Sequence, residues 1–185
     1  MGDNGAERKK EKERNEKMEI MEGQEYRMRN VLVCRAKMTQ LQVKEKSQEL
    51  DKYIKGIGAV PAGLPVTATY AVENGNEGPK IDMEFLIPLD RDISKEVSEG
   101  VKQNTLDKGV RFLPEFILTN AVKITHKGNP ARIQESLNAL NEYIADKKLV
   151  PITVGYNVTV KQPKTPGEID EMEIDTYVGI NPNRI

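Results

Sequence analysis

The spacing of hydrophobic positions changes along the chain in an order that occurs twice. In the first half, residues 30–38 are mostly β-prone and half alternating, which predicts a strand. A helix is predicted next from an apolar stripe at helical spacing, formed by Val43, Leu50, Ile54 and Ile57. Two more β-prone stretches follow, at residues 66–72 and 80–89. The first half is therefore predicted to be strand-helix-strand-strand.

The second half repeats this order. Residues 116–124 read as a strand, and residues 152–160 and 172–180 read as two more. Between them lies a second apolar stripe at helical spacing, formed by Ile133, Leu137, Leu140 and Ile144. The two halves should therefore be copies of one module.

Local signals mark where each predicted helix begins and ends. Thr39 and Gln42 have the spacing of a capping box, in which each side chain satisfies a backbone amide near the other residue. Gly56 and Gly58 indicate the end of this helix. In the second module, the Asn129-Pro130 pair predicts an N-cap followed by proline at the first helical position.

A short motif supports the repeat. Leu50-Asp51-Lys52-Tyr53-Ile54 followed by Val60-Pro61 matches Leu140-Asn141-Glu142-Tyr143-Ile144 followed by Val150-Pro151. A repeated helix exit implies two copies of one structural unit, and a pseudo-symmetric pair meets at an interface where a groove can form. We therefore predict an α+β fold: a tandem pseudo-two-fold repeat of strand-helix-strand-strand modules, its antiparallel sheet having helices on one face and a concave groove on the other.

Changes of composition divide the chain. Residues 1–25 are predicted to be a charged N-terminal tail or helix, because residues 6–17 carry charges of both signs without an apolar stripe. Module one should span residues 26–90 and module two residues 112–185. The polar residues 91–111 are read as a connector, and residues 26–185 as one globular domain.

Charge and cysteine content exclude several classes of protein. With 28 basic and 29 acidic residues, the chain lacks the basic surface expected for binding nucleic acid. The single cysteine, Cys34, cannot form an internal disulfide, and one histidine, His126, offers little to a metal ion. We expect no metal and no cofactor. No apolar run is long enough to cross a membrane, so we expect a cytoplasmic protein.

The last strand of each module carries a carboxylate at the same place. Glu84 in Glu84-Phe85-Leu86-Ile87-Pro88-Leu89 aligns with Asp175 in Asp175-Thr176-Tyr177-Val178-Gly179-Ile180. Because strand side chains alternate between faces, Met83, Phe85, Ile87 and Leu89 should lie under the helices. Glu84 and Asp175 should then lie on the opposite face.

Two interpretations of these carboxylates stay open. They are either solvated groups on the open face of a one-sided sheet or part of a binding groove. In the second case, a partly buried carboxylate lined by aromatic rings would favour a cationic or hydrogen-bonding ligand. The candidate ligand-binding residues are Glu84, Leu86 and Asp175 with Tyr70, Tyr156 and Tyr177.

Other reactive residues are read as structural. Cys34 lies in a strand pattern with no histidine nearby and is predicted to be a small core residue. His126 precedes a helix without an evident Ser or Cys partner and is predicted to be a turn residue. Tyr53 and Tyr143 lie beside core positions of the helices and should pack against the core. We therefore predict no catalytic residues.

The module order and the final strands resemble the GyrI-like small-molecule-binding domain, also called the bacterial transcription activator effector-binding domain. The resemblance covers about residues 26–181 and rests on Glu84 to Leu89, Asp175 to Ile180 and Asn129 to Val150. The pairing of Tyr26-Arg27-Met28-Arg29-Asn30-Val31 with Met83 to Pro88 is also similar to a Firmicute family of unknown function associated with type VII secretion loci that encode LXG toxins.

The resemblance implies a function. GyrI-like domains bind lipophilic, often cationic compounds, usually beside a DNA-binding domain, and some resemble hydrolases that use a Tyr and a Glu. Since this chain has no helix-turn-helix pattern, we expect a stand-alone, non-enzymatic binder of a small molecule in the groove between the modules. The alternatives are an adaptor for a polypeptide such as an LXG toxin, and a hydrolase with Glu84 as general base beside a tyrosine. The oligomeric state stays open.

Overall fold

A computed structural model describes residues 19–75 and 78–183. Residues 1–18, which form most of the predicted charged tail, lie outside the described residues. The prediction for residues 1–25 needs one correction, because the first strand already starts at Ile20. Side-chain burial alternates from Gln24 to Arg29, which is typical of a strand with one face covered.

The order of elements in the described residues follows the predicted modules. The first part of the chain contains β1 (Ile20–Met38), α2 (Gln40–Gly56), β2 (Val66–Gly75), β3 (Gly78–Pro88) and α3 (Ser94–Lys102). The rest contains β4 (Val110–Lys127), the 3-10 turn η1 (Pro130–Arg132), α4 (Ile133–Asp146), β5 (Pro151–Lys161), the 3-10 turn η2 (Pro166–Glu171) and β6 (Glu173–Ile180). The predicted connector 91–111 is thus not wholly irregular, because it contains α3.

The chain divides into two compact units. Unit 2 comprises Tyr26–Leu118 and Val154–Val158. The described part of unit 1 comprises residues 19–25, 119–153 and 159–183. Backbone hydrogen bonds connect the strands in the order β1-β3-β2-β5-β6-β4. The β1–β3, β2–β3, β2–β5 and β4–β6 pairs are antiparallel, so the predicted α+β class with an antiparallel sheet is confirmed.

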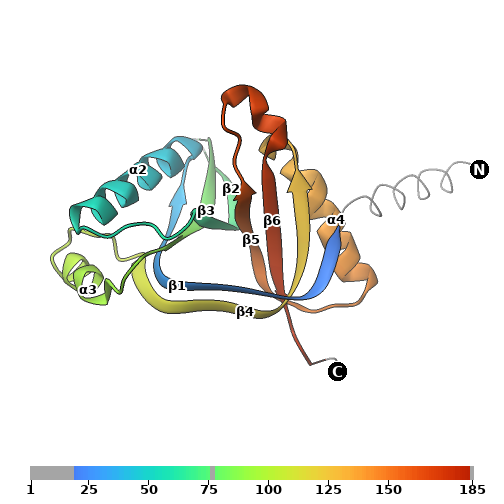
Figure 1. The fold of residues 1–185 in the computed structure, drawn as a ribbon, viewed down its shortest axis with the longest axis horizontal. Coiled ribbons are helices and arrows are strands. Elements are labelled where there is room, and N and C mark those ends of the chain that lie inside the picture. Colours follow the sequence, from blue (N-terminus) through green and yellow to red (C-terminus); the bar gives the residue numbers. More distant parts are fainter. Residues whose placement is uncertain (1–18, 76–77, 184–185) are drawn as a thin grey trace, which may run out of the picture. The chain divides into compact units, whose positions relative to one another are not determined.

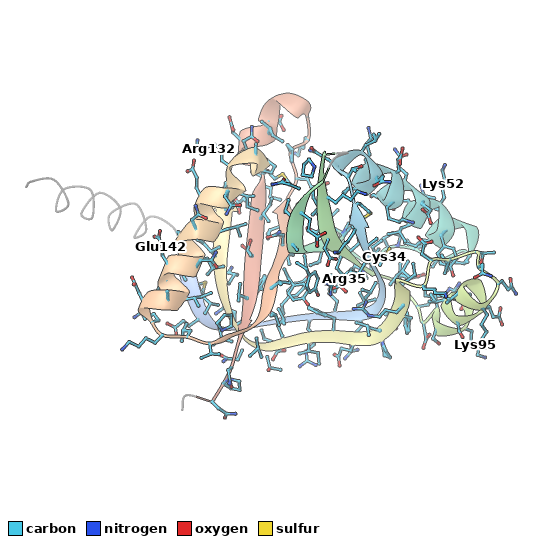
Figure 2. The ribbon with its side chains drawn as sticks, turned by 180° about the vertical axis from the view of Figure 1, so that it is seen from behind. Cys34, Arg35, Lys52, Lys95, Arg132 and Glu142 are labelled. Atoms are coloured by element: carbon cyan, nitrogen blue, oxygen red, sulfur yellow. The ribbon has the colours of Figure 1, made fainter. Side chains whose placement is uncertain are left out.

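The core of unit 2 lies between the sheet and helices α2 and α3 (Figure 1). Leu50 and Ile54 of α2 pack against Phe85 and Ile87 of β3. Cys34 of β1 is buried in the same cluster, as predicted for a core cysteine, and burial raises the pKa of its thiol. On the outer sides of the two helices, Lys52 and Lys95 remain exposed (Figure 2).

The core of unit 1 has the same design. Leu140 and Ile144 of α4 pack against Val178 and Ile180 of β6. Figure 1 shows α4 lying along the end of β4, whose Ile124 joins this cluster. Each helix is therefore held mainly by the apolar stripe that the sequence places on one of its faces.

The predicted helix signals are present in the structure. Thr39 caps α2, and its backbone N–H donates to the Gln42 side chain at 2.9 Å, completing the capping box. Asn129 Oδ1 accepts a hydrogen bond from the Ala131 N–H at 2.9 Å. This cap begins η1, which leads directly into α4.

The repeated motif forms the same helix exit in each unit. In unit 2 the Ala59 N–H donates to the Ile54 carbonyl at 3.1 Å, and in unit 1 the Leu149 N–H donates to the Ile144 carbonyl at 2.9 Å. The next carbonyls, of Val60 and Val150, accept from the N–H groups of residues 90 and 181 respectively. The sequence repeat is therefore also a structural repeat.

Candidate functional site

The predicted site residues fall into two separate groups. Glu84, Leu86, Tyr70 and Tyr156 belong to unit 2, and Asp175 and Tyr177 belong to unit 1. As predicted, Glu84 alternates with the helix-facing core residues of β3 and lies on the opposite face. Each group is described on its own below.

In unit 2, Glu84 is 2% exposed and is the centre of a polar cluster. The Tyr70 hydroxyl donates to Glu84 Oε2 at 3.0 Å, and Arg111 Nη2 donates to Oε1 at 2.7 Å. The strand register places Arg35 and Ala68 directly beside Glu84, and Tyr156 directly beside Ala68. Four strands therefore present neighbouring residues on one face.

Arg35 holds the other side of Tyr70. Its guanidinium carbon lies 3.5 Å from the centre of the Tyr70 ring, within cation-π range. The same guanidinium donates to both carboxylate oxygens of Asp82, at 3.0 and 2.9 Å. This bond lowers the pKa of Asp82. We call Arg35, Tyr70, Asp82, Glu84, Arg111 and Tyr156 the Glu84 cluster.

An irregularity in β2 accounts for the position of Tyr70. The β2–β3 register shifts between Thr69 and Ala71, so Tyr70 is the extra residue of a β-bulge. Bulges re-aim side chains, and here Tyr70 reaches the carboxylate paired with Ala68. Burial, above all, raises the pKa of Tyr70, and a hydrogen bond with Tyr156 adds to this rise. The phenol therefore stays protonated at neutral pH.

Aromatic and aliphatic groups border the Glu84 cluster. Phe116 meets Tyr156 edge to face, with ring centres 4.8 Å apart. Leu86, two residues beyond Glu84 on the same face, is buried and lies between Val33 and Val66 in the sheet. Unit 2 therefore places a paired carboxylate beside two phenols, a phenyl ring and an apolar surface.

In unit 1, Asp175 is also buried and paired. Its Oδ2 lies 3.0 Å from Lys123 Nζ, and its Oδ1 accepts from the Thr125 hydroxyl at 2.6 Å. The Tyr177 hydroxyl donates to the same carboxylate at 3.4 Å. Asp175 and Glu84 thus each have one cation and one phenol among their partners. The cation comes from β4 in both groups, whereas the phenol comes from β2 for Glu84 and from β6 for Asp175.

The sequence prediction missed the cations. Arg111 lies in the predicted connector, and Arg35 and Lys123 lie in predicted strands without being among the candidate site residues. The prediction did not include a basic partner for either carboxylate, and in the structure each of them has one. The strand register places Lys123 opposite Tyr177 and Arg35 opposite Glu84, whereas the ion pairs are Lys123–Asp175 and Arg35–Asp82. Cross-strand pairing alone would therefore not have identified these partners.

Among the described residues, no group of three or more His, Cys, Asp or Glu side chains is placed to hold a metal ion. No helix within residues 19–75 or 78–183 has the length and apolar content needed to cross a membrane.

Comparisons with known proteins identify the fold. No family model matches the chain, and no curated protein matches it. EcmrR in a complex with DNA matches with a TM-score of 0.69 and 13% identity, over 96% of this chain and 62% of the EcmrR chain. The chain thus spans less than two thirds of that protein.

This chain covers almost the whole length of two further solved structures. The EcmrR C-terminal domain has a TM-score of 0.64 and 13% identity, covering 89% of this chain and 98% of that one. A hydrolase from Listeria innocua has a TM-score of 0.52 and 12% identity, covering 92% and 98%. The chain therefore shares the fold of the EcmrR C-terminal domain.

Proposed function

We propose that this protein binds a small lipophilic molecule with a positively charged group, and that Glu84 is the counter-ion for that group. One observation carries the proposal. Glu84 is 2% exposed, whereas the side chain of Arg111, its ion-pair partner, is 50% exposed. A buried charge requires a partner, but the partner itself is free to be exchanged when it lies at the surface.

The exchange defines the chemistry of the ligand. An incoming ammonium or amidinium group takes the place of the Arg111 guanidinium on Glu84 Oε1, and Arg111 turns into solvent. The Tyr70 hydroxyl stays on Oε2 and keeps the carboxylate in position. Tyr156 and Phe116 then offer aromatic surface to the lipophilic part of the ligand.

A thermal-shift screen against lipophilic cations tests the proposal, because a compound that binds only the folded state raises the melting temperature. We expect a shift for the wild-type protein and its loss in Glu84→Gln. Glu73→Gln is the matched control, since it removes an exposed carboxylate of the same unit that lies outside the Glu84 cluster. Arg111→Met should bind the cation more tightly, because the ligand no longer competes with a guanidinium.

Two results would contradict this function. One is the absence of a shift with any cation. The other is a shift of equal size in the wild type and in Glu84→Gln, measured for compounds whose binding isothermal titration calorimetry confirms.

A hydrolytic function is the second candidate, favoured by the 3.0 Å contact between the Tyr70 hydroxyl and Glu84. The fold neighbour from Listeria innocua is a hydrolase. Since Tyr70 is held protonated, it would act as a hydrogen-bond donor to the substrate and Glu84 as the base that activates water. Turnover of bound compounds, followed by mass spectrometry, should then stop in Tyr70→Phe while binding persists.

The adaptor function stays a prediction. It rests on the resemblance to the family associated with LXG toxin loci and on the charged N-terminal segment, most of which lies outside the described residues. Affinity capture from the native host with the full chain, compared with a chain starting at Met18, tests it.

A further inference from the structure

Unit 1 contains a cavity that the proposed function does not use. Its volume is about 780 Å³, within the range of small-molecule sites. It lies where β4 ends and α4 begins, and its lining includes His126, Lys127, Arg132 and Ser136. Figure 2 shows Arg132 near the N-terminal end of α4.

His126 and Ser136 form a hydrogen-bonded pair in this lining. The His126 Nδ1 atom lies 2.9 Å from the Ser136 hydroxyl oxygen, and Nε2 lies 3.0 Å from the Asn129 carbonyl oxygen. The prediction that His126 is a turn residue without a Ser partner is therefore wrong. It is a buried residue of β4, and its partner lies ten residues further along the chain.

The contacts of the imidazole fix its tautomer. A carbonyl oxygen can only accept a hydrogen bond, so Nε2 must carry the hydrogen that it donates to Asn129. In the neutral ring Nδ1 is then an acceptor, and the Ser136 hydroxyl must donate to it. A hydroxyl that donates to an imidazole oriented by a third group has the arrangement of an activated nucleophile and its base.

The surroundings hold this pair in one geometry. Ser136 is 2% exposed and lies on the face of α4 that is otherwise buried through Ala139, Leu140 and Ile144. His126 is 7% exposed. A hydroxyl in such a position would cost stability without a partner, so the hydrogen bond to His126 keeps both side chains in place beside the cavity.

We propose that Ser136 is a nucleophile with His126 as its general base, and that the cavity accepts a small activated carboxylic ester. Ser136 Oγ forms a bond to the ester carbonyl carbon while its proton passes to His126 Nδ1. The bond from that carbon to the alcohol oxygen then breaks, and the alcohol leaves with the proton from His126. Attack by water, with the same base, releases the acid and restores Ser136.

The charges of the lining favour an activated ester over an amide. Three carboxylates, of Glu19, Glu135 and Asp170, also line the cavity, and Arg132 is paired with Glu135 at 3.3 Å. The exposed cations Lys127 and Arg132 are the lining groups that can stabilise the oxyanion that develops during attack. The N–H groups of Gly128 and Ala131 already donate to Met172 and Asn129. Since these two amides are occupied, the good leaving group of an activated ester compensates for an oxyanion site built from surface cations, one of which is shared with Glu135.

An alkyl fluorophosphonate tests the proposal on the full chain. Ser136 Oγ attacks phosphorus, fluoride leaves and the serine proton passes to His126, so the adduct is stable and can be located by peptide mass spectrometry. We expect one adduct per chain on Ser136. Labelling should disappear in Ser136→Ala and slow by at least about 100-fold in His126→Gln, which removes the base.

Controls separate this site from the rest of the protein. Ser98→Ala, at an exposed serine of α3, should label at the wild-type rate. Circular dichroism verifies that each variant is folded. The position of the adduct in the wild-type protein tests directly whether Ser136 is the nucleophile, without the use of any variant. No adduct, an adduct elsewhere, or equal rates in His126→Gln and wild type would overturn the proposal.

Discussion

At the scale of single residues, each buried carboxylate of the two final strands is balanced by one cation and one phenol. Glu84 has Arg111 and Tyr70, and Asp175 has Lys123 and Tyr177. Removing one member of such a group costs more than removing a surface charge, because the remaining charge stays away from water. The partners are therefore expected to be energetically coupled.

We predict strong coupling between Glu84 and Arg111. Arg111→Met should lower the free energy of unfolding by about 2–3 kcal/mol, because it leaves Glu84 buried without its cation. In the double variant with Glu84→Gln, the loss should be clearly smaller than the sum of the two single losses. Urea unfolding of the four proteins gives the coupling energy.

The exposed pair Lys161–Glu171 is the control for this cycle. Its side chains are 52% and 57% exposed, so Lys161→Met and Glu171→Gln should be additive within about 0.5 kcal/mol. Equal coupling in the two pairs would show that burial of Glu84 has no energetic role.

Gly109 is required by a close approach of two backbone segments. A Cβ at this position would overlap the carbonyl oxygen of Arg35, whose N–H donates to the Gly109 carbonyl at 3.2 Å. We predict that Gly109→Ala lowers the free energy of unfolding by about 1–3 kcal/mol, because a backbone atom cannot move aside easily. Gly56→Ala, where a Cβ meets no atom within 4 Å, should be neutral or stabilising in the same urea assay.

At the scale of elements, the two helix exits share one geometry but have different residues at the position that follows the C-cap. The position after the C-cap has a positive φ in both, +71° at Gly58 and +54° at Lys148. Glycine adopts this conformation without the steric penalty that a side chain brings. The exit of α4 is therefore more strained than the exit of α2.

Substitutions of Gly58 and Lys148 should change the free energy of unfolding in opposite directions. Gly58→Ala is expected to lower the free energy of unfolding by about 1 kcal/mol, and Lys148→Gly to change it by up to about 1 kcal/mol in the stabilising direction. Thermal and urea unfolding of both variants measure the effect. If Lys148→Gly destabilised the protein by more than Gly58→Ala, contacts of the Lys148 side chain, and not backbone strain, would dominate.

At the scale of the whole molecule, folding shifts the ionisation of most tyrosines in the same direction. Burial raises the pKa of Tyr26, Tyr53 and Tyr70, and a hydrogen bond to Glu22 raises that of Tyr143. Because the folded-state pKa values exceed the unfolded value of 10.0, these groups contribute stability that is fully present below pH 10 and is lost as pH rises through the folded-state values.

An alkaline titration followed by absorbance at 295 nm should display this shift. Of the six tyrosines, we expect at least four to ionise above pH 10 in the native protein, whereas in urea all six should ionise near pH 10. Tyr70→Phe should remove the phenol that ionises last. A native titration curve that overlaps the curve in urea would contradict the prediction.

The sequence alone determined the features that depend on near neighbours. The capping box at Thr39, the glycine at the exit of α2 and the apolar stripe through Leu50 and Ile54 all follow from the chemistry and spacing of a few consecutive residues. The alternation of β3 likewise placed Glu84 on the face opposite the core. The repeat of the helix exit then predicted a duplicated module.

Only the tertiary structure decided how these faces are completed. The bulge at Tyr70 shifts the register between β2 and β3, and no local sequence pattern predicts this bulge. Arg111 pairs with a carboxylate 27 positions away, and Ser136 meets His126 across a strand, a turn and a helix. Hydrophobic periodicity and helix capping depend on residues within one helical turn or one strand. The Arg111–Glu84 and Ser136–His126 contacts depend instead on strand register and on the path of the chain. The elements could therefore be predicted from the sequence, but the partners of Glu84 and His126 could not.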